Sequence, residues 1–228
     1  GDLIEGFPNQ QILNGVEVIR TDIVLRGHNP ISLIRNYLSY PRVAKKAINN
    51  LHKEFDVVFV YQLSPVLMIK PALYYKKKYN KKVYVYCLDL WPESLKALKL
   101  SENNPIYKLM LKISNSIYQK CDFISATSPA FLDYLSNINQ VKQDYLNVVY
   151  QHGEKMFLEV EPYKQQEKLN IVFAGNIGKV QDFDCLVNAV TRLPKEKLNQ
   201  LMITIIGSGS YLDEFKNKVN ENHLNDVF

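Results

Sequence analysis

The sequence contains few of the features that mark metal, redox or membrane-spanning proteins. Its three cysteines, Cys87, Cys121 and Cys185, are widely spaced, with no CxxC pair and no His/Cys spacing typical of zinc. We expect them to be buried, reduced thiols, as in a cytosolic protein. No apolar run approaches the ~20 residues of a membrane-spanning helix, and no signal peptide is recognisable. These absences predict neither a zinc site nor a membrane span.

Familiar nucleotide and nucleophile motifs are absent as well. There is no GxxxxGK[ST], which excludes P-loop chemistry, and no GxSxG nucleophile elbow. Two glycine pairs come near the dinucleotide motif GxGxxG without completing it. Gly175 and Gly178 lack the middle glycine, and Leu212 stands where a third glycine would follow Gly207 and Gly209. NAD binding is therefore disfavoured.

The bulk composition is that of a globular protein with a mild basic excess. Apolar residues make up 46% of the chain and charged residues 22%. Lysine and arginine number 28 against 23 acidic residues, a difference of +5. This excess suits an anionic ligand or membrane surface. Nucleic acid is a weaker interpretation, because no recognised binding motif accompanies the charge. The chain begins Gly-Asp without Met and stops after a helical pattern, so we expect a fragment.

Apolar strands alternate with amphipathic helices over the first 154 residues, which predicts right-handed βαβ units around a parallel sheet. The strands are expected over residues 16–19, 23–25, 56–61, 83–88, 122–127 and 147–150. The helices are expected over residues 31–38, 41–55, 65–79, 93–98, 105–120 and 129–135. Ser64-Pro65 and Ser128-Pro129 are interpreted as helix caps with proline in the first turn. The strand over 83–88 is predicted to be central, because it is apolar on both faces.

A polar stretch over residues 155–169 is interpreted as a linker. Beyond it, strands over 170–174 and 201–206 are each followed by a glycine loop and a helix, over 182–193 and 211–220. The predicted fold class is α/β. A Rossmann-like, doubly wound parallel sheet over residues 1–154 precedes the beginning of a second Rossmann-like domain over 170–228.

The stretch Asp-Leu-Trp-Pro-Glu-Ser directly follows the predicted central strand. Ligands of open α/β sheets bind outside the carboxyl ends of the strands. Asp89 and Glu93 are therefore candidate functional acids. The alternative is that either residue only caps the short helix that follows Pro92. Position alone does not decide between the two.

The glycine loops of the second half are candidate phosphate sites. Gly175, Gly178 and Lys179 lie at a strand-to-helix junction, where backbone N–H groups, a helix dipole and a lysine can meet an anion. Gly207 and Gly209 form a weaker second candidate. Glycine is also common at any tight turn between a strand and a helix, so neither loop is specific by itself.

Two basic stretches are candidate membrane or acceptor surfaces. Lys45 and Lys46 lie on a predicted amphipathic helix. A second predicted helix ends in a run of lysines among tyrosines, Lys76, Lys77 and Lys78. Such residues suit a lipid headgroup interface. The commoner alternative is a solvated helix face, with lysines at a helix end complementing the dipole.

Three motifs in order give a more specific signal than any one of them. Asp-Leu-Trp-Pro-Glu-Ser at 89–94, Gln-His-Gly-Glu at 151–154 and Phe-Ala-Gly-Asn-Ile-Gly-Lys at 173–179 together resemble family 4 (group 1) glycosyltransferases of the GT-B fold. The resemblance runs from about residue 15 onward. It points to the branch that builds capsular polysaccharide, exopolysaccharide or O-antigen.

The resemblance implies transfer of a sugar from a nucleotide-diphosphate sugar to a polyprenyl-linked or other saccharide acceptor. It implies retention of anomeric configuration, no metal or other cofactor, and a cytoplasmic enzyme held at the inner face of the plasma membrane. Asp89 is the first choice for orienting or deprotonating the acceptor hydroxyl, and Glu93 the second. The donor would contact residues of the two glycine loops: Gly175, Asn176, Gly178, Lys179, Gln181, Gly207 and Gly209.

The sequence departs from the family pattern in three places. Asn176 stands where the family often has arginine, which leaves the anionic donor to Lys179, with Gln181 donating hydrogen bonds. The family's first strand with its glycine-rich loop, and its late pair of glutamates separated by seven residues, are not found. These 228 residues alone are therefore expected not to transfer sugar. The alternatives are a non-catalytic module that docks to a membrane or partner and, more weakly, a sugar-nucleotide epimerase.

Overall fold

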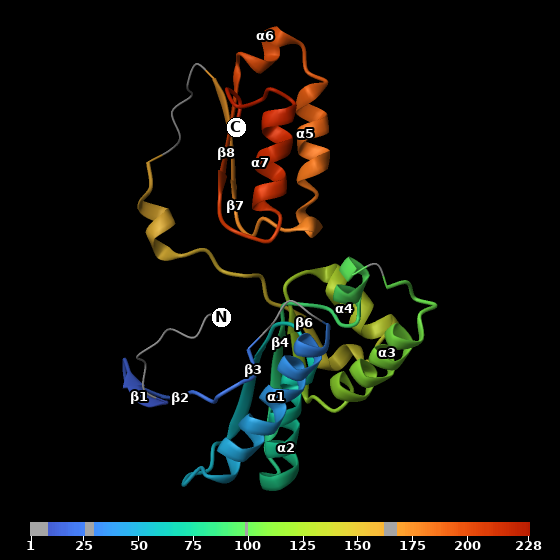
Figure 1. Ribbon diagram of the computed structural model, residues 1–228. Helices are drawn as coiled ribbons and strands as arrows, with labels where there is room; N and C mark the ends of the chain where they lie inside the picture. Colours follow the sequence, from blue (N-terminus) through green and yellow to red (C-terminus); the bar gives the residue numbers. More distant parts are fainter. Residues whose placement is uncertain (1–8, 26–29, 99, 162–167) are drawn as a thin grey trace. The chain divides into compact units, whose positions relative to one another are not determined.

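The computed structural model describes residues 9–25, 30–98, 100–161 and 168–228. The chain divides into two compact units, Gly1–His152 and Gly153–Phe228 (Figure 1). Each unit contains parallel strands connected through helices. The predicted α/β fold class is therefore confirmed, and each unit is described below by itself.

The first unit is built on a four-stranded parallel sheet with the strand order β3-β4-β5-β6. The strands are β3 (Val57–Gln62), β4 (Lys82–Cys87), β5 (Phe123–Ala126) and β6 (Leu146–Val148). The helices are α1 (Pro30–Asn49), α2 (Lys70–Tyr79), α3 (Pro105–Tyr118) and α4 (Pro129–Asn137). The 3₁₀ turns are η1 (Val66–Ile69), η2 (Glu93–Leu98) and η3 (Gln143–Tyr145). Among the described residues, no helix is both long and apolar enough to cross a membrane.

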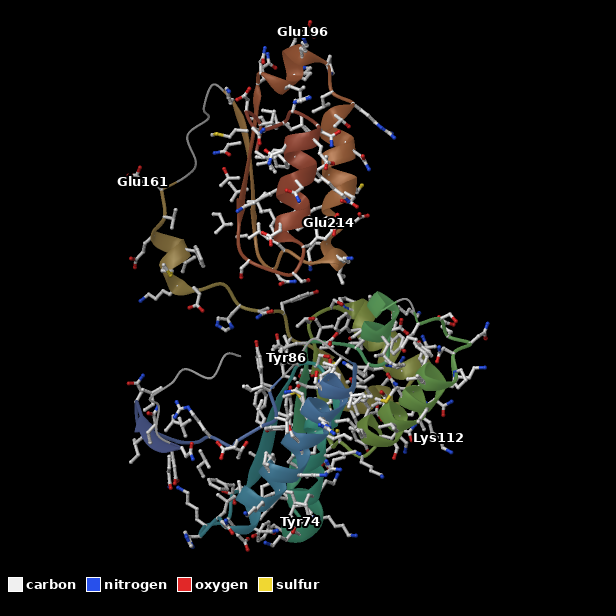
Figure 2. The ribbon with its side chains drawn as sticks, viewed as in Figure 1. Tyr74, Tyr86, Lys112, Glu161, Glu196 and Glu214 are labelled. Carbon is white, nitrogen blue, oxygen red and sulfur yellow. The ribbon has the colours of Figure 1, made fainter. Side chains whose placement is uncertain are left out.

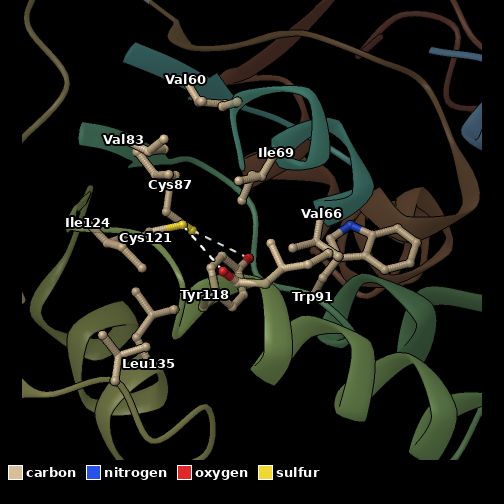
Figure 3. Packing of buried hydrophobic residues seen from close by; sticks show 14 of the residues in the cluster. Val60, Val66, Ile69, Val83, Cys87, Trp91, Tyr118, Cys121, Ile124 and Leu135 are labelled. Atoms are coloured by element: carbon tan, nitrogen blue, oxygen red, sulfur yellow. Dashed lines mark hydrogen bonds between the residues drawn. The ribbon is translucent and has the colours of Figure 1, made fainter. Parts of the chain in front are cut away.

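The core of this unit lies against one face of the sheet. Val83, Val85 and Cys87 of β4 are fully buried there, together with Ile124 of β5 and Tyr118 of α3 (Figure 3). Side chains alternate between the two faces of a strand, so the residues between them point to the other face. Since β4 lies between β3 and β5, the prediction of an interior strand over 83–88 is confirmed. Its carboxyl end leaves the core just before Asp89.

The strand predicted over 56–61 differs in its surroundings. Within the described part of the sheet, β3 pairs only with β4. Val57, Phe59 and Tyr61 are exposed, whereas Val60 and Gln62 are buried. The interpretation as a core strand is therefore correct for one face of β3 only. An unbroken apolar run reveals neither whether both edges of a strand are paired nor whether both of its faces are covered.

The two helices predicted over 31–38 and 41–55 are one helix, α1, with Pro41 inside it. An internal proline removes a backbone hydrogen bond and costs about 3 kcal/mol. Packing on both sides of the proline offsets this cost: Tyr37 contacts Trp91 before it, and Ala44 is buried after it. The helix ends at Asn49, so the prediction that it reaches residue 55 is also wrong.

The beginning of the described chain forms a hairpin, of which the sequence predicted only the second strand, over 16–19. β1 (Gln10–Leu13) pairs antiparallel with β2 (Val16–Ile19) through a turn at Asn14 and Gly15, which both have positive φ. Asn-Gly between two short apolar runs is a strong hairpin signal. The strand predicted over 23–25 is absent from the described structure. Instead, Val24 N donates to Ser39 Oγ at 3.1 Å, and Asn36 Nδ2 donates to Val24 O at 2.5 Å.

The second unit pairs β7 (Leu169–Ala174) with β8 (Leu201–Ile206) in parallel. Its helices are α5 (Phe183–Thr191), α6 (Lys195–Leu198) and α7 (Leu212–Glu221), and its 3₁₀ turns are η4 (Lys155–Glu159) and η5 (Lys179–Gln181). Ile177, Phe183, Val187, Ile203 and Phe215 form its core. The stretch predicted as a linker includes η4, and residues 162–167 of that stretch lie outside the described residues.

Candidate functional site

The loop after β4 carries the candidate acid Asp89 and is anchored by Trp91. The indole Nε1 of Trp91 donates to Ser64 Oγ at 2.9 Å, and its ring packs edge-on against Tyr37 with centroids 5.7 Å apart. Trp91 is 2% exposed. Ser64 follows β3, so this hydrogen bond joins the loops at the carboxyl ends of two neighbouring strands. The prediction that Ser64 caps a helix is wrong, since η1 has no side-chain cap.

A buried polar network fixes the backbone of Asp89. Gln62 Nε2 donates to the carbonyl oxygens of Asp89 and Leu63, both at 2.8 Å, and Gln62 Oε1 accepts from the Tyr118 hydroxyl at 3.2 Å. Cys87 Sγ lies 3.9 Å from the same hydroxyl (Figure 3). Burial raises the pKa of the Cys87 thiol to about 12, so the thiol stays protonated. Both the nitrogen and the oxygen of the Gln62 side-chain amide are thus hydrogen-bonded in the core, which favours a single loop geometry.

Only one of the two carboxylate oxygens of Asp89 accepts a hydrogen bond within the described part of the chain. Ser94 Oγ donates to Asp89 Oδ1 at 2.7 Å. In the described part of the chain, no hydrogen bond or ion pair involves Asp89 Oδ2, and the residue is partly exposed. Asp89 therefore has one oxygen held by its own loop and one available to a substrate hydroxyl. The cap interpretation is not supported for this side chain, because its partner is a side-chain hydroxyl and not a backbone N–H.

Glu93 is engaged much more fully. Its Oε1 accepts from the hydroxyls of Tyr107 and Tyr134 at 2.6 and 2.7 Å, and its Oε2 lies 2.6 Å from Lys96 Nζ. Burial alone would raise the pKa of Glu93, but the hydrogen bonds from Lys96 and the two tyrosines outweigh it and lower the pKa below 4.5. A carboxylate held this way is a weak base. Its contacts join η2 to α3 and α4.

The glycine loops after β7 and β8 contact each other through their backbones. Gly175 N donates to Ile206 O at 2.9 Å, and Ile177 N donates to Ser208 O at 2.8 Å. A Cβ at Gly207 would lie 1.9 Å from Gly175 O, and one at Gly209 would lie 2.1 Å from Ile177 O. Only glycine allows this approach. The structure therefore brings the two candidate loops together and gives Gly207 and Gly209 a packing role.

Gln181 and Lys179 differ in how far they are engaged. Gln181 Oε1 accepts from Gly178 N at 3.1 Å, so the side chain occupies the backbone N–H predicted to face a phosphate. Asn176 Nδ2 lies 2.7 Å from the position of a Cβ at Gly178. Lys179 is exposed, and within the described ranges its ammonium group takes part in no hydrogen bond or ion pair. A phosphate oxygen entering this turn would replace the Gln181 contact and meet Lys179.

The helix after this turn offers less to an anion than predicted. α5 begins at Phe183, after the separate turn η5, and Asp182 Oδ1 already accepts from Cys185 N at 3.4 Å. An acid at the helix start repels an incoming anion and uses the available N–H group. The attraction for a phosphate therefore comes from Lys179 and from the Gly178 amide once Gln181 is displaced, and not from the dipole of α5.

The predicted basic surface is partly neutralised. Lys76 Nζ lies 2.7 Å from Asp122 Oδ2 and donates to Lys120 O at 2.9 Å. Lys45 Nζ lies 4.5 Å from the centroid of the Tyr74 ring, and Lys78 Nζ donates to Asn49 Oδ1 at 3.0 Å. Lys46 and Lys77 are exposed. These lysines lie on α1 and α2, away from the Asp89 loop, as the labelled Tyr74 and Tyr86 at opposite ends of this unit indicate (Figure 2).

Several residues that shape the site were not predicted from the sequence. Gln62 was the one polar residue at the end of an apolar strand, which is a usable signal for a site at a strand's carboxyl end. Tyr107, Tyr118 and Tyr134 lie on amphipathic helices, where tyrosine at a core position gives no hint of its hydroxyl's partner. No group of three or more His, Cys, Asp or Glu placed to hold a metal ion occurs among the described residues.

Comparison with known proteins identifies the fold. No protein-family model matches the chain, and no curated protein matches its sequence. Solved structures match over most of it. A glycosyltransferase from Rickettsia africae is 15% identical, with a TM-score of 0.54, over 92% of this chain and 53% of that one.

Two further structures agree with this result. A TarM variant from S. aureus, solved with fondaparinux, alpha-GlcNAc-glycerol and UDP, is 13% identical with a TM-score of 0.54 over 84% of this chain and 36% of its own. A GtfA/B complex is 16% identical with a TM-score of 0.54 over 82% and 36%. The chain thus spans about half or less of these structures. It has the fold of glycosyltransferases, as the GT-B resemblance predicted.

Proposed function

We propose that the chain is part of a glycosyltransferase that moves a sugar from a nucleotide-diphosphate sugar to a saccharide acceptor. The observation that carries this proposal is the joining of the Gly175–Gly178 loop and the Gly207–Gly209 loop at the carboxyl ends of a parallel strand pair, in a chain with a glycosyltransferase fold. Fold alone does not determine function. The ordered motifs at 89–94, 151–154 and 173–179 add support from the sequence.

Each loop has a distinct task in the proposed reaction. The diphosphate of the donor is bound by Lys179 and, once the Gln181 side chain has moved away, by the Gly178 amide, and both stabilise the leaving group as negative charge develops on it. Asp89 Oδ2 accepts a hydrogen bond from the acceptor hydroxyl and orients it for attack. The contacts of Glu93 favour a positioning role for that residue, although it was the second candidate for the acid.

The finer features of the proposal follow the family 4 resemblance. They are retention of anomeric configuration without a metal, a lipid-linked acceptor in surface polysaccharide synthesis, and work at the cytoplasmic face of an anionic membrane. Partly exposed lysines on α1 and α2 support the membrane contact. The domain roles follow the same resemblance, with residues 1–154 on the acceptor side and 170–228 on the donor side.

Donor binding is tested by isothermal titration of the protein with a panel of UDP-, GDP- and dTDP-sugars. We expect one donor class to bind, and Lys179→Ala to weaken it about tenfold to a hundredfold, the effect of one charge-assisted hydrogen bond. Lys195→Ala, an exposed lysine change in the same unit, is the matched control. If every donor fails to bind, or if both variants bind as the wild type does, the donor assignment is wrong.

Acceptor chemistry is tested separately with Asp89→Asn in the full-length glycosyltransferase of which this chain is proposed to be part. This variant keeps the hydrogen bond from Ser94 but replaces Oδ2 with an amide nitrogen, which cannot accept from the acceptor hydroxyl, so transfer to a lipid-linked acceptor in membranes should fall by at least about a hundredfold. Donor affinity should remain unchanged. Transfer at the wild-type rate would remove Asp89 from the mechanism while leaving the donor site in place.

A further inference from the structure

A basic hollow lies between α2 and the amino-terminal ends of β4 and β5. Its volume is about 970 Å³. Its one acidic lining residue is Asp122. Five lysines also line it: Lys70, Lys76, Lys77, Lys82 and Lys120. This end of the sheet is opposite to the carboxyl end that carries the Asp89 loop, so the hollow is separate from the proposed acceptor site.

Most of the positive charge in the hollow is not neutralised. Asp122 is paired with Lys76 at 2.7 Å and also accepts from Val83 N at 2.8 Å. This pair neutralises one of the five lysines and leaves four. Lys120 Nζ donates to the neutral hydroxyl of Ser116, and Lys82 lies 5.8 Å from the Phe123 ring centroid. The hollow therefore presents four positive charges to an occupant.

The dipole of α2 does not account for this arrangement. Lys77 lies in the last turn of α2, where a lysine complements the helix dipole. Lys70, however, is the first residue of the helix, where a positive charge is unfavourable. Lys70, Tyr74 and Lys77 are spaced i, i+4 and i+7 and so form one stripe of the helix that faces the hollow. What these three residues share is that their side chains line the hollow.

Aromatic side chains line the same hollow. Phe123 is 40% exposed and Tyr145 43% exposed, and Tyr74 is labelled at this end of the unit in Figure 2. Exposed aromatic rings beside lysines suit the boundary between lipid headgroups and acyl chains, where an apolar body and a charged tip are both accommodated. A duplex nucleic acid or an acidic protein surface would not require these rings.

We propose that this hollow docks the protein on an anionic lipid surface, with lipid phosphates bound by Lys70, Lys77, Lys82 and Lys120. The inference deepens the membrane partner of the proposed function. It moves the contact from the predicted run of Lys76 and its neighbours to a concave site. Vesicle binding requires no sugar nucleotide, so failure of the donor titration and failure of docking are separate outcomes.

The test is co-sedimentation with phosphatidylcholine vesicles with or without phosphatidylglycerol. We expect binding only to the anionic vesicles, with a loss of about fivefold for each hollow lysine changed to glutamine, and of several hundredfold for the Lys70, Lys77, Lys82 and Lys120 quadruple variant. The charge-matched control changes Lys108, Lys112, Lys195 and Lys197 to glutamine. Circular dichroism establishes that both variants are folded.

Each other outcome overturns the proposal. Equal losses in the two quadruple variants would show attraction by net charge without a site. Binding of inorganic phosphate or pyrophosphate to the hollow without vesicle binding would show a soluble anion as its ligand. Binding of single-stranded RNA in preference to anionic vesicles, abolished in the hollow variant, would assign the hollow to nucleic acid.

Discussion

Replacing Gly209 with alanine tests the loop packing in the second unit. The new Cβ would lie 2.1 Å from the carbonyl oxygen of Ile177 and 2.5 Å from its carbonyl carbon. That oxygen accepts from Tyr211 N at 3.0 Å, and Ile177 N donates to Ser208 O at 2.8 Å. The side chain of Ile177 is 1% exposed in the core. Relief of the clash must therefore move backbone that is both hydrogen-bonded and packed.

The expected cost follows from these contacts. Two backbone hydrogen bonds contribute about 1 kcal/mol each, and forcing a packed core residue aside costs about 1–3 kcal/mol. Together they predict a loss of about 3–5 kcal/mol in the free energy of unfolding of the second unit. For a unit of this size, the midpoint temperature should fall by at least about 12 °C.

Calorimetry and hydrogen exchange at the amides of β7 and β8 measure this loss. Gly153→Ala is the matched control, because a Cβ at Gly153 would meet nothing within 4 Å. The loops are also the proposed donor site, so sugar-nucleotide affinity should fall together with stability in Gly209→Ala. If the two alanine variants have the same midpoint and exchange rates, the close contact of the loops is wrong.

Three further predictions concern the first unit and the thiols. For Glu93→Gln, we expect the wild type to be about 1–2 kcal/mol more stable near neutral pH. Because the folded-state pKa of Glu93 is below 4.5, this advantage is present above that pH and is lost as the pH falls through the folded-state pKa, as urea unfolding at several pH values would show. Ser64→Ala leaves the buried indole N–H of Trp91 without its acceptor and should cost about 1–3 kcal/mol, measured by tryptophan fluorescence in urea. The prediction of buried thiols is wrong for Cys185, which is exposed, whereas the other two are buried with their pKa raised to about 12. A disulfide reagent should therefore modify one thiol in the native protein and three in urea.

Each of these has a clear contrary result. A stability difference for Glu93→Gln that is constant with pH would show that its charge is not held by the tyrosines and lysine. Ser64→Ala with wild-type stability would show that the indole finds another partner. Rapid modification of two or three native thiols would contradict the buried positions of Cys87 and Cys121.

Local sequence patterns predicted the parts of the fold that depend on neighbouring residues. The strand over 201–206 and the cap at Ser128 agree with β8 and α4, because apolar alternation and a side-chain cap are both local. The position of Asp89 just beyond an interior strand is also confirmed. The two functions proposed for the ends of β4, acceptor binding at Asp89 and lipid binding at Lys82, stay predictions.

Contacts between distant residues could not be predicted in the same way. The bond from Trp91 to Ser64 and the bonds from Gln62 to Asp89 and Tyr118 join residues far apart in sequence. The two helices predicted over 31–38 and 41–55 are joined across Pro41, because packing of α1 outweighs the cost of an internal proline. Ser64 has the sequence of a cap but is used as an acceptor for an indole. In each case the deciding contact is tertiary.

The length of β4 has a consequence for the acceptor. Lys82 opens the strand in the basic hollow, and Asp89 lies seven residues later. At about 3.3 Å per residue, their Cα atoms are about 23 Å apart. If phospholipid headgroups bind at Lys82, the acceptor hydroxyl must lie roughly that far above the membrane surface to reach Asp89. A lipid that bears one sugar would be too short to reach it, whereas a lipid that already bears several sugars would be long enough.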